Sequence, residues 1–314
     1  MEWLEAHVAQ IWFLIIGFFV LYYAVADGYD LGVGIIALFT QNEEKRGIMM
    51  ASLQSVWQEN QTWLVVLGGM LFGLIFRGIA FEFRDHSKTP SLWSLSFGIG
   101  SLITALSQGF TLGGIFYGIP MEGYNFTGTI WSWFHPYSIL FTLGVLSGYI
   151  MLGANYLIMK TSGVIQRRSV LHSYLATCST LIISISIYIW TIARHPYMAR
   201  KWLDMPGLIY VAVFPLFALL SLVMYLRSLH KRSEVAPLLW NVTFVLCAFI
   251  GLSVGFYPYI IPNMVTIKSA AVSSSNTLIF MLAVTIILLP LVLAYIGYKN
   301  WIFRGKVGNS GYGD

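Results

Sequence analysis

The sequence predicts an all-α protein that crosses a membrane about eight times. Hydrophobic residues make up 57% of the 314 residues, charged residues make up 10%, and the mean hydropathy is +0.73. A soluble domain has about 25% charged residues, and a membrane-spanning helix needs about 20 mostly apolar residues in a row. Apolar stretches near that length recur at 11–39, 63–81, 92–118, 137–159, 171–193, 207–226, 237–257 and 277–298. No loop is long enough for a soluble domain, so residues 1–314 are expected to form one integral membrane domain.

The segments between these stretches support the same assignment. The first stretch lacks a basic leader region and a cleavage site of small residues, so we interpret it as an anchor rather than a cleaved signal. The connection from Gly118 to Pro136 contains Trp131, Trp133 and no basic residue, as expected of an aromatic belt at the membrane surface. Prolines in the 194–206 and 258–270 connections stop helices at the membrane edge. The tail after residue 304 is polar and rich in glycine.

The distribution of lysine and arginine predicts the orientation. If the amino terminus lies in the cytoplasm, eight spans place twelve of these residues on the cytoplasmic side and six outside. Cytoplasmic loops carry the excess of basic residues, so both termini are expected in the cytoplasm. The net charge of +5 follows from this bias, and it indicates no nucleic-acid partner.

Two aspartates, Asp27 and Asp30, interrupt the first apolar stretch. Residues 11–26 and 31–39 on either side of them carry no charge. Acids kept within a membrane are usually paired or functional, and spacing of three residues places both carboxyls on one helix face. The pair therefore indicates proton or cation movement. The structural alternative is that the two carboxyls cap backbone groups near the external end of the helix.

Two further groups of polar residues lie in the first third of the chain. Residues 57–63 place a polar patch between two tryptophans, where Glu59, Asn60 and Gln61 could line a hydrated entrance or form an ordinary interfacial loop. Residues 74–84 alternate charged and large apolar residues at an expected cytoplasmic membrane edge. Arg77 could bind an anionic group or a partner subunit's carboxylate in a bidentate fashion, and Arg84 could extend to the surface. Plain anchoring by positive charge is the alternative for both arginines. The candidate contact residues for a partner subunit or lipid are Trp57, Asn60, Trp63, Arg77, Glu82 and Arg84.

The sequence indicates no metal or haem site of its own. The six histidines all lie at the ends of the predicted spans, where they could not ligate a haem within the membrane. The two cysteines, Cys178 and Cys247, fall inside spans, which argues against a disulfide framework or a cysteine metal site.

Taken in order, several motifs resemble one family, subunit II of the cytochrome bd-type quinol oxidases, particularly the branch called cyanide-insensitive. Each motif alone is weak, but together they cover nearly the whole chain. They are Asp27-Gly-Tyr-Asp-Leu-Gly-Val-Gly34, Trp57-x-x-Asn60-x-Thr-Trp63-Leu, Gly73-Leu-Ile-Phe-Arg-Gly-Ile-Ala-Phe-Glu-Phe-Arg84, Gln108-Gly109, Gly118-Ile-Pro120, Phe256-Tyr-Pro-Tyr-Ile-Ile-Pro262 and Trp301-Ile-Phe-Arg-Gly-Lys306.

The resemblance implies a subunit of an enzyme in the bacterial inner membrane. In that family a separate subunit I carries the haem b and haem d cofactors and the quinol site. The complex oxidises quinol, reduces O₂ to water and takes protons from the cytoplasm without pumping. Small single-span accessory subunits sometimes join, and a structural quinone or lipid in this subunit is left open. Subunit II is expected to form two four-helix bundles, residues 1–160 and 161–314, without haem. Asp30 matches an acid linked to a proton pathway, Asp27 is its neighbour, and Glu59 is a further candidate for that pathway.

Two departures from the family pattern stand out. The family usually has an aspartate directly after the first tryptophan of the 57–63 motif, where this chain has Gln58. Glu59 is the next residue, but one helical position turns its carboxylate by about 100°. Further, residues 64–76 provide only about 20 Å of uncharged helix for a membrane core of about 30 Å. Family members have further apolar residues here, so the sequence reads as though a membrane segment were missing between Gly73 and Leu74.

Two other functions remain open from the residues. A proton-coupled transporter would also have many spans and buried acids, although such proteins commonly contain inverted repeats and broken helices, which this sequence does not show. A purely structural scaffold for subunit I would use Asp27 and Asp30 only for packing.

Overall fold

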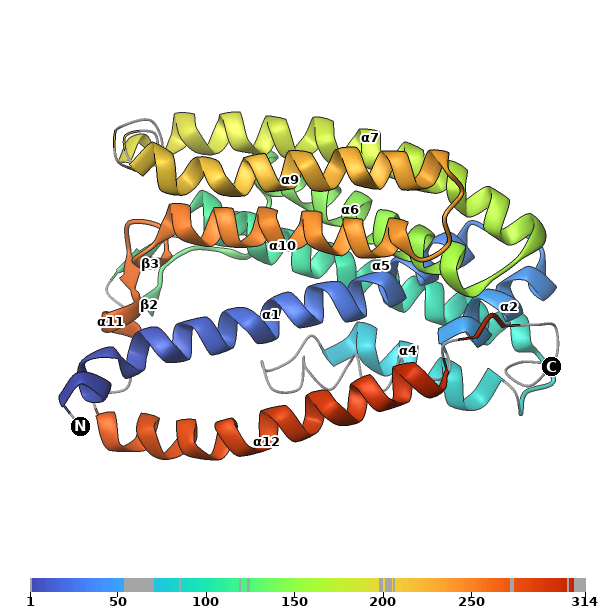
Figure 1. Ribbon diagram of the computed structural model, residues 1–314, viewed down its shortest axis with the longest axis horizontal. Helices are drawn as coiled ribbons and strands as arrows, with labels where there is room; N and C mark the ends of the chain where they lie inside the picture. The colour runs from blue at the N-terminus through green and yellow to red at the C-terminus, as the bar shows by residue number, and fades with distance from the viewer. Residues whose placement is uncertain are drawn as a thin grey trace.

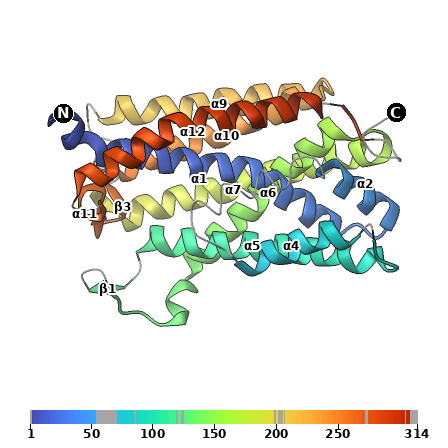
Figure 2. The same ribbon diagram turned by 90° about the horizontal axis from the view of Figure 1, so that it is seen from below.

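The protein is an elongated bundle of long helices (Figures 1 and 2). The computed structural model describes residues 2–53, 71–84, 86–118, 120–122, 125–197, 200, 205, 207–271, 274–303 and 305–307. Seven helices in these ranges are long and apolar enough to span a membrane. They are α1 (Glu2–Leu38), α5 (Pro90–Tyr117), α6 (Pro136–Lys160), α7 (Gly163–Arg194), α9 (Gly207–His230), α10 (Ala236–Phe256) and α12 (Ser275–Ile302). The prediction of an all-α polytopic membrane protein is confirmed.

Short elements occupy the two ends of the bundle. One end holds α2 (Glu43–Leu53) and the end of α4 (Leu71–Arg84). The other end holds two antiparallel hairpins, β1 (Met121–Glu122) with β2 (Asn125–Phe126) and β3 (Tyr259–Ile261) with β4 (Val265–Thr266). Also in the chain are the 3-10 helix η1 (Ile130–Trp133), which follows β2, and α11 (Ile267–Ala270), which follows β4. The hairpins fall in the connections that the sequence assigned to the external surface.

Local sequence explains where several of the long helices begin. Pro90, Pro136 and Pro237 each lie in the first turn of their helix, α5, α6 and α10 respectively. Proline is well suited to this place because its missing N–H has no partner there in any helix. At the start of α6 the ring of His135 also accepts a hydrogen bond from the backbone N–H of Tyr137. These helices therefore begin within two residues of the predicted spans.

The centre of the molecule is the contact of α1 with α5 and α6. Helix α4 packs on α5, α7 packs on α6, α10 packs on α9, and α12 lies along α1. Leu31, Phe97 and Leu157, one from each central helix, are fully buried. Helices α1 and α6 approach most closely at Gly32 and Gly153, where a Cβ on Gly32 would lie 1.8 Å from the carbonyl oxygen of Tyr149. Small residues allow such contacts between helix backbones in membranes.

A buried polar cluster joins α6, α7 and α9. The hydroxyl of Ser173 donates to the Asn155 side chain at 2.7 Å and lies 2.7 Å from the hydroxyl of Tyr225. Thr177 is 3.0 Å from the same tyrosine oxygen. The packing of α7 on α6 crosses the boundary at residue 160, and the division into bundles 1–160 and 161–314 stays a prediction.

The described helices place the start of α1 and the end of α12 differently from the predicted arrangement with both termini on one side. Helix α1 ends and α5 begins at one end of the bundle, and the guanidinium of Arg84, at the end of α4, is 3.4 Å from Glu43 in α2. The chain therefore leaves α1 and enters α5 at the same end, and the described part of the 63–81 stretch does not lead it across. With seven crossing helices in the described ranges, the start of α1 and the end of α12 lie at opposite ends (Figure 1).

This topology concentrates basic residues at one end. Lys45 and Arg46, which the eight-span assignment placed outside, now lie at the end where α12 finishes. Among the described residues, twelve lysines and arginines belong to this end and three, Arg194, Arg200 and Lys268, to the other. By the positive-inside rule we expect the basic end to face the cytoplasm, which would place the start of α1 outside, and the side of each terminus stays a prediction. The twelve are Lys45, Arg46, Arg84, Lys88, Lys160, Arg167, Arg168, Arg227, Lys231, Arg232, Lys299 and Lys306.

The end of the chain is fixed to this basic end by contacts with α6. The Lys160 side chain donates hydrogen bonds to the carbonyls of Phe303 and Gly305, and the backbone N–H of Val307 donates to the carbonyl of Lys160. Lys306 pairs with Glu234, which also accepts a hydrogen bond from Gln166. These contacts hold the end of α12 beside α6 and the α9–α10 connection.

The structure describes part of the second predicted span, residues 63–81. Helix α4 has 14 residues and continues through Gly73 and Leu74, which corresponds to about 21 Å of helix. Residues 63–70 of the predicted span lie outside the described residues. The shortening of the second span near residues 73 and 74 stays a prediction.

We expect acid to destabilise the external end through His195, which follows α7. Its ring is 5% exposed and contacts the carbonyl of Phe116 at 2.9 Å. Burial lowers the pKa of His195 below 6.5, and Arg194 lowers it further against the opposing effect of this hydrogen bond. Below pH 6.5 the unfolded chain therefore binds a proton that the folded chain resists, so stability should fall between pH 7.5 and 5.5. Thermal unfolding at both pH values, with the His195→Gln variant as comparison, tests this. An equal loss in both proteins would contradict it.

Candidate functional site

The two aspartates of the first span face an arginine from another helix. Asp27 and Asp30 lie on α1, Arg77 lies on α4, and all three side chains are 0% exposed. One guanidinium nitrogen of Arg77, NH1, donates to both carboxylate oxygens of Asp27, at 2.8 and 3.0 Å. The other terminal nitrogen, NH2, lies 3.7 Å from an oxygen of Asp30. The three residues form a buried ion cluster, which we call the aspartate–arginine cluster.

This geometry corrects the interpretation of Arg77. The sequence suggested an arginine at the membrane edge, available to a lipid, an anionic cofactor or a partner carboxylate. Instead it is fully buried and pairs with acids of its own chain. The two partners are 50 residues apart in the sequence, and no spacing rule connects them. The ring of Phe97 lies 5.7 Å from the guanidinium carbon and covers one side of the cluster.

A chain of hydrogen bonds continues from Asp27 towards the external end. Tyr23, one helical turn before Asp27, interacts with it by a side-chain hydrogen bond. The side-chain amide of Gln108 on α5 donates to the Tyr23 oxygen at 2.6 Å, and the hydroxyl of Tyr149 on α6 donates to the Gln108 oxygen at 2.6 Å. Three helices thus share the polar groups that surround Asp27. Gln108 was noted in the sequence only as part of a motif, and its role could not be inferred from that motif.

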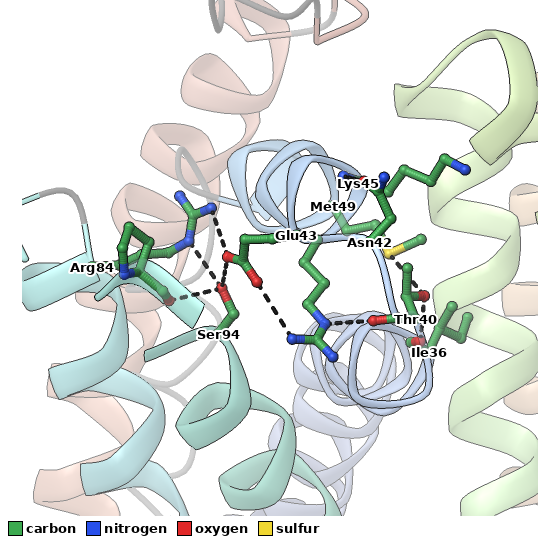
Figure 3. Close-up of polar contacts among 10 residues, drawn as sticks. Ile36, Thr40, Asn42, Glu43, Lys45, Met49, Arg84 and Ser94 are labelled. Carbon is green, nitrogen blue, oxygen red and sulfur yellow. Dashed lines mark hydrogen bonds and ion pairs between the residues drawn. The ribbon is translucent and has the colours of Figure 1, made fainter. Parts of the chain in front are cut away.

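A second polar cluster joins α2, α4 and α5 at the basic end of the bundle (Figure 3). The hydroxyl of Ser94 donates to a Glu43 oxygen at 2.7 Å, and Arg84 donates to Ser94 at 3.1 Å. The other Glu43 oxygen is 3.3 Å from a nitrogen of Arg46, whose Nε also donates to the carbonyl of Thr40. Arg84, predicted to extend to a lipid or a partner, instead pairs with Glu43 on its own chain. Sequence reasoning missed both Glu43 and Ser94.

The remaining candidates divide into two groups. Glu82 is exposed near the end of α4, and its contact with a partner or lipid stays a prediction. Trp57, Glu59, Asn60 and Trp63 lie outside the described residues. Among the described residues, no group of three or more histidine, cysteine or acidic side chains is arranged to hold a metal ion.

Chemically, the aspartate–arginine cluster suits the binding and release of a proton. Two carboxylates and one guanidinium carry one excess negative charge when all three are ionised. Such a charge is costly where water is excluded, and uptake of a proton removes it. The cluster, shared by α1 and α4, lies between the polar contacts of Glu43 and those of Gln108.

Comparison with known proteins adds three findings. A family model described as cytochrome bd terminal oxidase subunit II matches residues 8–73 and 69–303. This match breaks at the place where the sequence suggested a missing membrane segment. The cytochrome bd-I ubiquinol oxidase subunit 2 of Escherichia coli strain K12 is 25% identical over 360 residues, covering 95% of this chain and 94% of the relative. Since this chain has only 314 residues, that alignment includes positions at which it has none.

Two further similarities agree with these. The cytochrome bd ubiquinol oxidase subunit 2 of Bacillus subtilis is 26% identical over 192 residues, covering 52% of this chain and 57% of the relative. A chain in the solved structure of the bd oxidase from Geobacillus thermodenitrificans has the same fold, with a TM-score of 0.71 and 18% identity. The match covers 94% of this chain and 99% of that one.

Proposed function

Because this chain belongs to the family of cytochrome bd terminal oxidase subunit II, we propose that it is the haem-free subunit of a quinol oxidase in the bacterial inner membrane. Subunit I is its partner and supplies the haems and the quinol site. The complex transfers electrons from quinol to O₂, and this chain supports subunit I and provides part of a route for the consumed protons. Lipids, a structural quinone and small accessory subunits are further proposed partners.

The proton route rests on the aspartate–arginine cluster. Asp27 and Asp30 are fully buried in α1, and the cluster has one more acid than base among the described residues. The polar contacts of Glu43, Arg84 and Ser94 lie at the basic end of the bundle, which is expected to face the cytoplasm. This arrangement supports proton entry from the cytoplasm towards Asp30, and from there to subunit I.

The absence of haem from this chain is proposed on the positions of its histidines. Five of the six lie near helix ends or in connections, and His172 lies nine residues into α7. A haem held within the membrane needs an axial ligand there, which histidines at helix ends or in connections do not supply. The matching test is whether haem absorbance remains with the larger partner when the two subunits are separated.

A scaffold function remains as the second candidate, because the Asp27–Arg77 pair could serve packing alone. The oxidase function is tested by purifying the chain with its partner from native membranes, recording the reduced-minus-oxidised spectrum and measuring quinol-driven O₂ uptake. Haem b and d bands with turnover support the oxidase function, and a colourless chain without a partner contradicts it.

The proton route is tested by Asp30→Asn in the same complex. We expect the haem spectrum to be retained and O₂ uptake to fall about tenfold or more, since proton-transfer groups contribute about 10²–10⁴ to rates. Glu5→Gln is the matched control, because Glu5 is an exposed acid on the same helix, and it should leave both readouts unchanged. Full turnover in Asp30→Asn would favour the scaffold.

A further inference from the structure

Gln108 links the aspartate–arginine cluster to two further helices through both ends of its side-chain amide. The side chain is buried on α5. Its Nε2 group donates to the Tyr23 oxygen at 2.6 Å, and its Oε1 atom accepts from the Tyr149 hydroxyl at 2.6 Å. A glutamine amide has a donor end and an acceptor end that are not interchangeable. The way this amide faces therefore decides where the hydrogens of both tyrosines point.

The orientation of the amide leaves the hydrogen of Tyr23 for Asp27. Tyr23 interacts with Asp27 by a side-chain hydrogen bond, while its oxygen accepts the N–H of Gln108. A phenol has one hydrogen, so it can donate to only one of two neighbours. If the amide faced the other way, its oxygen would compete with Asp27 for that hydrogen. The direction of the Gln108 amide thus controls a hydrogen bond that Gln108 itself does not make.

Tyr149 holds the amide in this direction. Its ring packs against α1 beside Asp27, where a Cβ on Gly28 would lie 2.8 Å from a ring carbon. The packing of α6 on α1 therefore fixes the place of the hydroxyl that donates to Gln108. Turning the amide over would take the acceptor away from this buried hydroxyl, and a buried donor that loses its acceptor costs free energy.

We propose that Gln108 is a positioning residue of the proton route: its amide aims the Tyr23 hydroxyl at Asp27, and Tyr149 fixes the direction of the amide. The effect of Gln108 on Asp27 passes through Tyr23. Hydrogen-bond donors that are aimed in advance need no rearrangement at the moment of reaction, which favours rapid transfer at the cluster. This inference rests on the proposed proton route.

A double-mutant cycle in the complete oxidase tests whether Gln108 acts through Tyr23. Gln108→Met keeps the length of the side chain and removes its hydrogen bonds, and Tyr23→Phe removes the donor to Asp27. We expect each change to lower the maximal rate of quinol-driven O₂ uptake about three- to tenfold, which is the range that one hydrogen bond is worth. The haem spectrum and the KM for quinol should be retained, because the quinol site is proposed to lie in subunit I.

The combined variant decides the result. If Gln108 acts through Tyr23, then Gln108→Met with Tyr23→Phe should be no slower than Tyr23→Phe alone, because the second change removes nothing that is still present. Losses that multiply in the combined variant overturn the positioning role. A wild-type maximal rate in Gln108→Met alone also overturns it.

Tyr149→Phe tests the same role by removing a single oxygen atom, and it gives an answer even if Gln108→Met does not assemble. We expect a loss of maximal rate no larger than that of Gln108→Met, and no further loss when Tyr149→Phe is added to Tyr23→Phe. A wild-type rate in Tyr149→Phe, or a further loss in the combination, overturns the role of Tyr149 in fixing the amide.

Tyr225→Phe is the matched control for these tyrosine changes. Tyr225 is a buried tyrosine whose oxygen lies 2.7 Å from the hydroxyl of Ser173, in the polar cluster of α6, α7 and α9. The change removes a buried hydroxyl from a hydrogen-bond network, as Tyr149→Phe does. We expect Tyr225→Phe to keep the wild-type maximal rate. A loss as large as that of Tyr149→Phe would show that the rates follow packing, and it would overturn the proposal.

Failure of this inference can be told from failure of the proposed function. If Asp30→Asn keeps full O₂ uptake, the proton route and the inference that rests on it are both wrong. If Asp30→Asn loses O₂ uptake while Gln108→Met and Tyr149→Phe keep it, the route stands and only the positioning role fails.

Discussion

Replacement of Arg77 by methionine is expected to prevent assembly of the complex. The change leaves Asp27 and Asp30 fully buried without their cation. Breaking a buried ion pair by removing one partner typically costs about 3–5 kcal/mol, a large part of the stability of most domains. The measurement is the yield of haem-bearing complex that this subunit brings down on affinity purification, which should fall to a small fraction of the wild-type yield.

A charge-balanced variant is the control for this prediction. Asp27→Asn combined with Arg77→Met removes both members of the closest pair, and replacing a whole buried ion pair by neutral groups is often tolerated. We expect the double variant to recover much of the lost yield. A yield as low as that of Arg77→Met alone would show that the shape of the arginine, rather than its charge, holds the helices together.

Gly32→Ala is expected to disrupt the packing of α1 on α6. The new Cβ would lie 1.8 Å from the carbonyl oxygen of Tyr149 and 2.9 Å from the backbone nitrogen of Gly153. Both contacts are with backbone, so no change of side-chain rotamer relieves them, and the helices must separate. Overpacking in a well-packed core costs about 1–3 kcal/mol, occasionally more. We expect a lower midpoint of thermal unfolding and a lower yield of complex.

Gly17→Ala is the matched control on the same helix. A Cβ at Gly17 meets no atom within 4 Å, and alanine favours helix over glycine by about 1 kcal/mol. Its thermal midpoint should equal or slightly exceed that of the wild type. If the two variants behave alike, the close approach of α1 and α6 at Gly32 is not a determinant of stability.

The positions of the long helices could be predicted closely from sequence, but the path of the chain could not. Seven of the eight predicted spans correspond to long helices, with the boundaries off mainly at the starts of α1, at Glu2 rather than near 11, and of α7, at Gly163 rather than near 171. Hydropathy locates residues that are stable in lipid, and it ignores whether a segment crosses or returns. The 63–81 stretch passed that criterion, while α4 brings the chain back to the end where α1 finished. One segment that returns instead of crossing changes the end of the bundle at which the amino terminus lies.

Only the acids of the candidate site could be predicted from the sequence. Asp27 and Asp30 were found because an acid in an apolar helix is costly and therefore conspicuous in any sequence. Arg77 was assigned to the membrane edge because position along the chain was the only guide to its depth. Its contact with Asp27 arises from the packing of α1, α4 and α5, which no local pattern encodes.

The sequence alone thus determined the membrane class, the helices and the acids, since each depends on the transfer of individual residues from water to lipid. Only the tertiary structure decided which arginine pairs with the two acids and at which end of the bundle the chain begins. Those features depend on contacts between residues far apart in the sequence, such as the 50 residues that separate Asp27 from Arg77. Ion pairs of this kind are fixed by how helices pack, because distance and exclusion of water set their strength.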